Sequence, residues 1–336
     1  MVRLRAGIIG LGVGEKHIES YQGHPQCEVV ALCDFSEEKI SMVKNRYPGL
    51  KLTKKAEEIL DDPEIDIVSI ASFDNYHYEQ IIQGLNNDKH LFVEKPLVLH
   101  PEEAKSIRKI LNKKPSIRLS SNLNLRTTPR FIRLKEAVQS GELGRVYYLE
   151  GDYLWGRISK LTDGWRKEMD FYSIVHGAAV HMIDLILWIM EMKPLEVKGY
   201  GNRIATQNSG FKFNDFAVIL MRFENGMIAK VSANGGCVHP HFHRMGVFGT
   251  KKTFSYDISG GKMIDSSDPN ADIVALIEEY PATNERKKVI TTFIDSILNT
   301  GTKPVVSCEE VFETLSVCFA AEKSIHENRS ILVEYI

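Results

Sequence analysis

The sequence predicts an α/β protein with two domains, a doubly wound parallel sheet followed by an α+β domain built on an open, mostly antiparallel sheet. A glycine-rich turn follows the first apolar run, at residues 10–14. β-like runs and helical patterns then alternate up to residue 121, which is typical of a parallel sheet. Beyond residue 195, β-like segments follow one another directly, as in antiparallel sheets. Because 336 residues exceed what one core usually serves, we expect domains at 1–122 and 123–336.

The composition is that of an ordinary globular protein, with 43% hydrophobic and 26% charged residues. Lysines and arginines number 42 against 44 acids, so no basic excess favours nucleic acid or an anionic membrane, and we expect neither as a partner. The five cysteines are scattered without CxxC spacing, which is typical of reduced thiols in a cytoplasmic protein. No targeting segment is expected, because the first strand begins within a few residues.

The first apolar run, residues 4–9, leads into Gly10-Leu11-Gly12-Val13-Gly14, after which a helical pattern begins. Glycines at a strand-to-helix turn let the backbone approach a pyrophosphate, whose charge then lies at the helix N-terminus. We therefore expect Gly10, Gly12, Val13 and Gly14 to contact a dinucleotide. Glu15 stands where the third glycine of the usual G-x-G-x-x-G motif is expected, so the motif alone is a weak signal.

The second strand, residues 28–33, ends at Asp34, about twenty residues beyond the glycines. A carboxylate in this place accepts hydrogen bonds from the hydroxyls of an adenosine ribose. It repels a 2′-phosphate, and residues 35–38 contain no arginine, so the sequence favours NAD over NADP. The alternative, a carboxylate that caps the following helix, is compatible with the cofactor role.

The alternation continues with strands at residues 65–71, 90–93 and 117–121. The loop after the first of these strands opens a helix, so Ser72, Asp74 and His77 should border the phosphates or the nicotinamide ribose of the cofactor. For His77, packing as an N-terminal helix residue is an equal alternative.

The strand at residues 90–93 ends in Glu94-Lys95-Pro96. The proline imposes a fixed turn, so the two charged side chains are presented at the carboxyl end of the strand, where open α/β sheets bind ligands. A lysine held there can hydrogen-bond a ribose, polarise a hydroxyl or carbonyl group, or transfer a proton. We therefore assign Glu94 and Lys95 to the cofactor site and Lys95 also to catalysis; a solvated salt bridge at the strand end is the alternative.

The segment at residues 122–129 carries polar groups at alternate positions and marks the crossing between the domains. Its Arg126 either orients the substrate or ties the domains together. The loop after residue 155 gathers cations and indoles, among them Trp165 and Arg166. Aromatic rings stack on the C–H faces of sugars and arginine binds carboxylate or phosphate, so Trp165 and Arg166 are candidate substrate contacts. A solvated basic loop is the alternative.

His181 and Asp184 are three residues apart in a helical pattern that runs to about residue 191, so they share one helix face. A carboxylate close to an imidazole supports a histidine that accepts and returns a proton. Gly177-Ala178-Ala179 removes bulk one turn earlier, which lets a planar ring approach. A hydrogen-bonded core histidine is the alternative interpretation of His181.

The last third contains β-like segments at residues 196–203, 216–223, 227–233 and 245–248, and Asn225-Gly226 is a strong signal for a two-residue hairpin. Helical patterns at residues 287–299 and 308–328 precede a terminal strand. One face of an open antiparallel sheet can be covered by a helix and the other by a partner subunit, so we expect a homodimer or homotetramer formed through this sheet.

Three alternate residues, His239, His241 and His243, suggest a metal site, because alternate residues of a strand point the same way. Pro240 interrupts a regular strand, however, and no cysteine or carboxylate completes a zinc set nearby. We therefore predict no metal, and we place a histidine of this loop at the rim of the substrate pocket.

As a set, these residues resemble the Gfo/Idh/MocA family of glucose-fructose oxidoreductase, inositol dehydrogenase and rhizopine-catabolism proteins over nearly the whole chain. The matching pieces are Gly10-Leu11-Gly12, Asp34, Asp74 with His77, Glu94-Lys95-Pro96, Asn124-x-Arg126-x-x-Pro129, Gly164-Trp165-Arg166 and His181-x-x-Asp184. The resemblance implies a Rossmann domain and a nicotinamide-dependent oxidoreductase acting on a sugar, a cyclic polyol or a nucleotide sugar. It also implies a cis peptide before Pro96, Lys95 reaching the nicotinamide ribose and the substrate, and His181 acting on the hydroxyl that is oxidised.

Gly177 departs from the pattern of this family, which has an aspartate one helical turn before the histidine. A carboxylate there would share a face with His181 and support its protonation cycle. The candidates to replace it are Asp184, Lys95, or Asp170 and Tyr172 of the preceding loop. Either the proton is handled differently, or catalysis is weak or lost.

The leading hypothesis is an NAD-dependent dehydrogenase that transfers a hydride between a secondary alcohol of a sugar-like substrate and nicotinamide C4. His181 is the expected general acid and base, Lys95 polarises the reacting oxygen, and Asp184 orients His181. Two alternatives stay open. One is a sensor or partner-binding module that binds NAD(H) and a sugar without turnover, and the other is an enzyme that holds its cofactor tightly and cycles it between two substrates.

Overall fold

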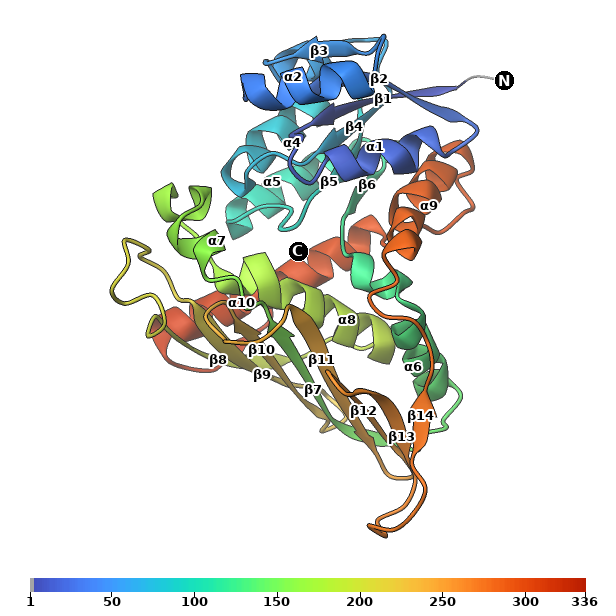
Figure 1. The fold of residues 1–336 in the computed structure, drawn as a ribbon, viewed down its shortest axis with the longest axis vertical. Coiled ribbons are helices and arrows are strands. Elements are labelled where there is room, and N and C mark those ends of the chain that lie inside the picture. The colour runs from blue at the N-terminus through green and yellow to red at the C-terminus, as the bar shows by residue number, and fades with distance from the viewer. Residues whose placement is uncertain (1–2) are drawn as a thin grey trace. The chain divides into compact units, whose positions relative to one another are not determined.

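The computed structural model of the chain describes residues 3–336, which divide into two compact units. The first unit comprises the chain through Asn124 together with Asn284–Phe312 and Ile336, and the second comprises Leu125–Thr283 and Glu313–Tyr335. Figure 1 shows both units, with the chain coloured from its N-terminus to its C-terminus. The predicted roles of residues 1–122 in cofactor binding and 123–336 in substrate binding stay predictions.

The first unit is built on a parallel sheet with the strand order β3-β2-β1-β4-β5-β6. Its strands are β1 (Leu4–Ile9), β2 (Cys27–Cys33), β3 (Lys51–Thr53), β4 (Ile67–Ile70), β5 (His90–Val93) and β6 (Leu119–Ser121). The chain order reverses between β1 and β4, so a crevice for ligands is expected at the carboxyl ends of these two strands. The predicted doubly wound parallel sheet is therefore confirmed.

Helices cover this sheet, and two of them begin at a cap or a proline that the sequence provides. They are α1 (Glu15–Gln22), α2 (Glu37–Arg46), α3 (Glu57–Leu60), α4 (His77–Asn86), α5 (Pro101–Leu111) and α9 (Lys287–Leu298). Ser36 accepts a hydrogen bond from the backbone of Lys39 and so starts α2, and Pro101 stands in the first turn of α5. Helix α9 returns from the far end of the chain to pack beside α1, and the Phe293 ring lies 5.7 Å from that of Phe92 on β5.

The second unit is built on an open sheet with the order β14-β13-β12-β11-β7-β10-β9-β8-β15. Neighbouring strands are antiparallel except β7 and β10, so the predicted open, mostly antiparallel sheet is confirmed. The strands are β7 (Val146–Leu154), β8 (Glu196–Asn202), β9 (Phe216–Arg222), β10 (Ile228–Asn234), β11 (Phe242–Gly249), β12 (Thr253–Asp257), β13 (Gly260–Ile264), β14 (Val274–Leu276) and β15 (Ile331–Leu332). The Asn225-Gly226 turn joins the paired strands β9 and β10, as predicted, with Gly226 at a φ of 83°.

Helices α6 (Pro129–Gln139), α7 (Ser159–Thr162) and α8 (Val180–Met190) belong to the second unit, and α10 (Cys308–Glu327) contributes its residues from 313 onward. In Figure 1, α8 and α10 lie across one face of the second sheet. Alternation along β7 places Leu149, Gly151 and Tyr153 on the face that meets α8. Any side chain at position 151 would crowd Met182 of α8, so this glycine permits the close approach of helix and sheet. Among residues 3–336, no helix is both long and apolar enough to cross a membrane.

Candidate functional site

The glycine-rich turn joins β1 to α1 through two positions that tolerate no side chain. Gly10 has a φ of 89°, and a Cβ atom there would collide with the carbonyl oxygen of Ala71. A Cβ atom on Gly14 would collide with the carbonyl oxygen of Gly10 and lie 2.9 Å from the Ala71 side chain. The turn is therefore folded tightly against the end of β4 although Glu15 occupies the place of the usual third glycine.

Asp34, at the end of β2, is tied to this turn. Its carboxylate accepts hydrogen bonds from the backbone N–H of Leu11 at 2.7 Å and from that of Ser36 at 2.9 Å. The ammonium group of Lys39 lies 3.3 Å from Asp34 Oδ2 and forms an ion pair with it. Lys39 was not among the predicted site residues; its position five residues after Asp34, in the first turn of α2, was the available signal.

Two aromatic rings meet beside Asp34. Phe35 follows β2 and Phe73 follows β4, and their ring centroids are 5.5 Å apart in an edge-to-face arrangement. Phe35 is 64% exposed. The pair offers an apolar surface on which a planar base can stack, and the sequence analysis did not single out either ring.

The loop after β4 is held by His77, which is fully buried at the start of α4. His77 Nδ1 donates to the carbonyl oxygen of Pro96 at 2.8 Å, and its Nε2 lies 3.2 Å from the carbonyl oxygen of Ser72. The Ser72 hydroxyl donates to Gln80 at 2.8 Å, and Asp74 is buried in the 3₁₀ turn Asp74–Tyr76. His77 thus links the loops after β4 and β5, and its predicted contact with a cofactor stays a prediction.

Glu94 is an internal anchor for the segment that carries Lys95. Its carboxylate is buried and accepts from Asn122 Nδ2 at 2.6 Å, from His17 Nε2 at 3.1 Å and from the Lys95 backbone N–H at 3.2 Å. Burial alone would raise the pKa of Glu94, but the hydrogen bonds and positive charge of its partners outweigh burial and lower it. The other ring nitrogen of His17, Nδ1, forms a hydrogen bond with the Ser69 hydroxyl at 2.9 Å.

Lys95 itself is half-buried, and the Lys95–Pro96 peptide is cis, as the family resemblance implied. His17 belongs to α1, so one network connects the helix of the glycine turn to the residue that precedes Lys95. This network, defined by His17, Ser69, Glu94 and Asn122, holds the lysine at the carboxyl end of β5.

In the second unit, His181 lies on α8 directly after a π-helical turn, Val175–Ala179. His181 is 8% exposed, and its ring meets those of Tyr153 on β7 and His243 on β11, with centroids 5.9 Å and 6.2 Å away. Tyr153 and His243 are stacked at 4.5 Å with 9° between their planes. Single π-helical turns inside helices are frequent at functional sites.

Two hydrogen bonds extend this group of rings. The Tyr153 hydroxyl bonds His241 Nε2 at 2.9 Å, and His243 Nδ1 bonds the Tyr280 hydroxyl at 2.6 Å. The structure therefore places His243 of the 239–243 segment beside His181, and it links His241 and Tyr280 to this group through Tyr153 and His243. Tyr153 and Tyr280 were not among the predicted site residues. Among the residues that the structure describes, no group of three histidine, cysteine or acidic side chains is arranged to hold a metal ion.

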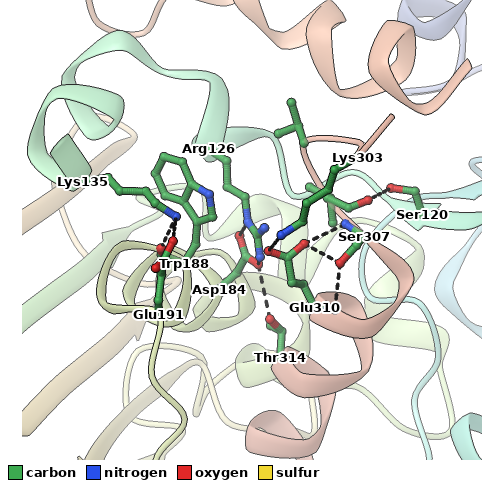
Figure 2. A network of polar contacts seen from close by, with 12 residues as sticks. Ser120, Arg126, Lys135, Asp184, Trp188, Glu191, Lys303, Ser307, Glu310 and Thr314 are labelled. Atoms are coloured by element: carbon green, nitrogen blue, oxygen red, sulfur yellow. Dashed lines mark hydrogen bonds and ion pairs between the residues drawn. The ribbon is translucent and has the colours of Figure 1, made fainter. Parts of the chain in front are cut away.

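Asp184 and Arg126 form a buried ion pair (Figure 2). Arg126 Nε donates to Asp184 Oδ2 at 3.0 Å and Nη2 donates to Oδ1 at 2.6 Å, while each side chain is 1% exposed. The Thr314 hydroxyl of α10 donates to the same carboxylate at 3.3 Å. This bidentate pair locks α8 in place; the predicted substrate contact of Arg126 and the orientation of His181 by Asp184 stay predictions.

Trp165 and Arg166 lie on a 3₁₀ turn of the second unit, Trp165–Glu168. The Arg166 guanidinium lies over the rings of Trp165, Trp155 and Tyr172, at 4.2 Å, 5.3 Å and 5.8 Å from their centroids. Within residues 3–336, no acceptor is in hydrogen-bond distance of its buried Nε. The aromatic neighbours therefore orient this cation.

Comparison with known proteins agrees with this geometry. Residues 4–122 match the profile described as "Oxidoreductase family, NAD-binding Rossmann fold", and residues 131–255 match that of the "GFO/IDH/MocA C-terminal domain". The chain belongs to the Gfo/Idh/MocA oxidoreductase family. It is thus an oxidoreductase with an NAD-binding Rossmann domain, and the family resemblance seen in the sequence is confirmed.

Several dehydrogenases are similar to this Gfo/Idh/MocA protein along its whole length. Myo-inositol 2-dehydrogenase of Thermotoga maritima is 27% identical, with 99% of both chains covered. Scyllo-inositol 2-dehydrogenase (NADP(+)) of Bacillus subtilis is 22% identical, covering 99% of this chain and 96% of the relative. The crystal structure of scyllo-inositol dehydrogenase from Lactobacillus casei with NAD(H) and scyllo-inositol has the same fold, with a TM-score of 0.79, 18% identity and coverage of 98% and 99%.

The first unit of this family member fits a dinucleotide. The turn at Gly10 and Gly14 leaves no room for a Cβ atom, so the backbone itself can approach a pyrophosphate. The Asp34 carboxylate is held at the carboxyl end of β2, and Phe35 and Phe73 form an apolar surface next to it. Gly12 and Val13 lie on the same turn, where Val13 is 51% exposed. These residues would hold the pyrophosphate and the adenosine, and the bound nicotinamide would supply the hydride acceptor or donor.

Proposed function

We propose that this protein is an NAD-dependent dehydrogenase that oxidises a secondary alcohol of a sugar, a cyclic polyol or a nucleotide sugar, or catalyses the reverse reduction. In the forward direction the C–H bond gives its hydride to nicotinamide C4, and the O–H proton passes to a base. The observation that carries the proposal is the position of His181, buried on α8 after a π-helical turn and bordered by the rings of Tyr153 and His243. The dehydrogenase relatives support the substrate class.

In this proposal, different residues of the chain move the proton, contact the cofactor, orient His181 and bind the substrate. His181 accepts the hydroxyl proton during oxidation and returns it during reduction. Lys95, held by the Glu94 network, contacts the nicotinamide ribose and polarises the reacting oxygen. Asp184 fixes α8 through its ion pair with Arg126 and so orients His181. Trp165 and Arg166 contact the substrate, with the Arg166 guanidinium oriented by its aromatic neighbours.

NAD is the proposed cofactor in preference to NADP, because the Asp34 carboxylate lies where a 2′-phosphate would enter. Ser72, Asp74 and His77 line the nicotinamide half of the same site in this proposal. The uncovered face of the second sheet carries paired charges such as Lys230 with Asp152, and we propose that it forms the interface of a homodimer or homotetramer. The unpaired cysteines support a cytoplasmic location.

The test is a fluorescence titration of the purified protein with NADH and NADPH, followed by a screen of polyols, sugars and nucleotide sugars for reduction of NAD. We expect NADH to bind at least tenfold more tightly than NADPH, a difference of about 1.4 kcal/mol, and one substrate class to be turned over. His181→Asn should then abolish turnover while NADH affinity stays unchanged. Tight NADH binding without turnover of any substrate would favour the sensor alternative, and failure to bind either nucleotide would refute the proposal.

A further inference from the structure

We infer that the hydroxyl group of Tyr172 is the polar group that positions His181 and its substrate hydroxyl, in the place that Gly177 leaves open. The inference rests on the proposed function, in which His181 is the acid and base. It starts from a steric relationship: a Cβ atom on Gly177 would collide with the Tyr172 hydroxyl oxygen and lie 3.0 Å from its Cζ. The phenol therefore occupies the space that any side chain at position 177 would need.

The position of Gly177 on its helix tells where this hydroxyl lies. Gly177 precedes His181 by four residues, and side chains four apart share a helix face, with Cβ atoms about 5–6 Å apart. The Tyr172 hydroxyl lies next to the ideal Cβ position of residue 177, and we infer from this spacing that it faces the side of the helix from which His181 projects. The wider π-helical turn Val175–Ala179 covers this stretch of backbone.

Tyr172 reaches this place through a short, well-anchored piece of chain. The Ser173 hydroxyl accepts from the backbone N–H groups of Val175 and His176, both at 3.1 Å, and so caps the turn next to Tyr172. The tyrosine is 2% exposed, and its ring meets the edges of Phe211 and Phe213 at centroid distances of 5.7 Å and 6.5 Å. With the Arg166 guanidinium 5.8 Å away, the ring is constrained on several sides.

The chemistry of a phenol suits the task and differs from that of a carboxylate. A phenol both donates and accepts a hydrogen bond, so it can hold a substrate hydroxyl in line with an imidazole. It is neutral at pH 7, whereas a carboxylate at this distance would stabilise the imidazolium ion and raise the pKa of the histidine. The rings of Tyr153 and His243 contact His181 from the sheet, and the Asp184 carboxylate is engaged by Arg126.

The first test is Tyr172→Phe, which removes only the hydroxyl oxygen and leaves Gly177 room. We expect kcat/KM to fall by about 10²-fold, the lower range for a lost proton-transfer partner, with NADH affinity unchanged and the pH dependence of kcat/KM displaced. Tyr147→Phe, on a tyrosine that is 54% exposed on β7 of the same unit, is the matched control and should have no effect. Unchanged kcat/KM and an unchanged pH profile in Tyr172→Phe would overturn the inference.

A rescue experiment separates positioning from packing. Tyr172→Ala should lose activity, and Tyr172→Ala combined with Gly177→Asp should regain at least tenfold, because the space freed by the phenol accepts a carboxylate on the same helix face. The pH profile of the double variant should lie at higher pH than that of the parent, since the carboxylate favours imidazolium. A double variant no better than Tyr172→Ala would count against the inference.

A titration that needs no turnover distinguishes this inference from the proposed function. With ¹³C-labelled histidine, the His181 signal, assigned by its loss in His181→Asn, should titrate differently in Tyr172→Phe and in the parent protein. A changed titration supports the role of Tyr172 even if no polyol is oxidised, in which case the proposed function alone fails. Identical titration curves would refute the role of Tyr172 whatever the activity.

Discussion

The guanidinium of Arg126 and the carboxylate of Asp184 form a two-pronged ion pair in which each side chain is 1% exposed. Removing one member of such a pair leaves a buried charge without compensation, which costs about 3–5 kcal/mol. We therefore expect Arg126→Met to lower the free energy of unfolding by about that amount, as measured by urea denaturation.

A control and a compensating variant make this prediction specific. Glu102→Gln breaks an exposed pair with Lys105 and should change the free energy of unfolding by less than about 1 kcal/mol. Arg126→Met combined with Asp184→Leu removes both buried charges and should recover much of the loss. A double variant as unstable as Arg126→Met would show that the cost came from packing.

The Glu94 network predicts a dependence of stability on pH. The pKa of Glu94 is lowered in the folded protein, so on acidification the unfolded chain takes up the proton first. The stabilisation is present above the ordinary carboxyl pKa of about 4.5 and is lost as the pH falls through the lower, folded value. Free energies of unfolding for the parent and for Glu94→Gln should therefore differ above this range and converge in acid. A difference that stays constant across the acid range would contradict this assignment.

The glycine turn can be tested with a pair of glycines that share a backbone conformation. Gly10 and Gly49 have φ values of 89° and 88°, but only at Gly10 would a Cβ atom collide with the neighbouring backbone. Gly49→Ala should cost about 1–2 kcal/mol of stability and leave NADH affinity unchanged. Gly10→Ala should be more destabilising and should abolish NADH binding in a fluorescence titration. Equal effects of the two variants would mean that conformational strain alone explains them.

Lys39 should determine how strongly the protein rejects NADPH. Its ammonium lies 3.3 Å from Asp34 Oδ2, so it offsets the negative charge that would repel a 2′-phosphate. We expect Lys39→Ala to weaken NADPH binding about tenfold more than NADH binding, which is about 1.4 kcal/mol, in paired titrations. Lys44→Ala, an exposed lysine later in the same helix, is the control and should affect neither nucleotide. If Lys39→Ala weakened the binding of NADH and NADPH equally, the lysine would instead contact the pyrophosphate, which both nucleotides contain.

Much of the fold follows from signals that act over a few residues. The strand at residues 90–93 and the hairpin at Asn225-Gly226 lie where the pattern predicts them. Each depends on the local properties of proline, glycine or alternating apolar residues, which neighbours in the chain suffice to express. Strands β12 to β14 were not predicted; they are only 5, 5 and 3 residues long, although buried and less buried residues alternate along β12 and β13.

The candidate site divides in the same way. Gly10, Asp34, Lys95 and His181 are recognisable in the sequence because spacing along one turn, strand or helix carries their signal. The partners of these residues cannot be recognised in the sequence. Tyr153 and His243, for example, are ninety residues apart and meet only because β7 pairs with β11. Long-range pairing has no local signature, so such contacts exist only once the sheet has formed.

Tyr172 and Gly177 show the limit most clearly. The sequence by itself determined that position 177 has no side chain, and it left open both the group that replaces the missing carboxylate and whether catalysis is retained. Only the tertiary structure decided that the Tyr172 hydroxyl occupies that space, because the path of the loop before the π-helical turn depends on packing against Phe211, Phe213 and Arg166. Spacing along the chain determines which residues share a helix face. The packing of distant segments determines which side chains fill the space next to that face.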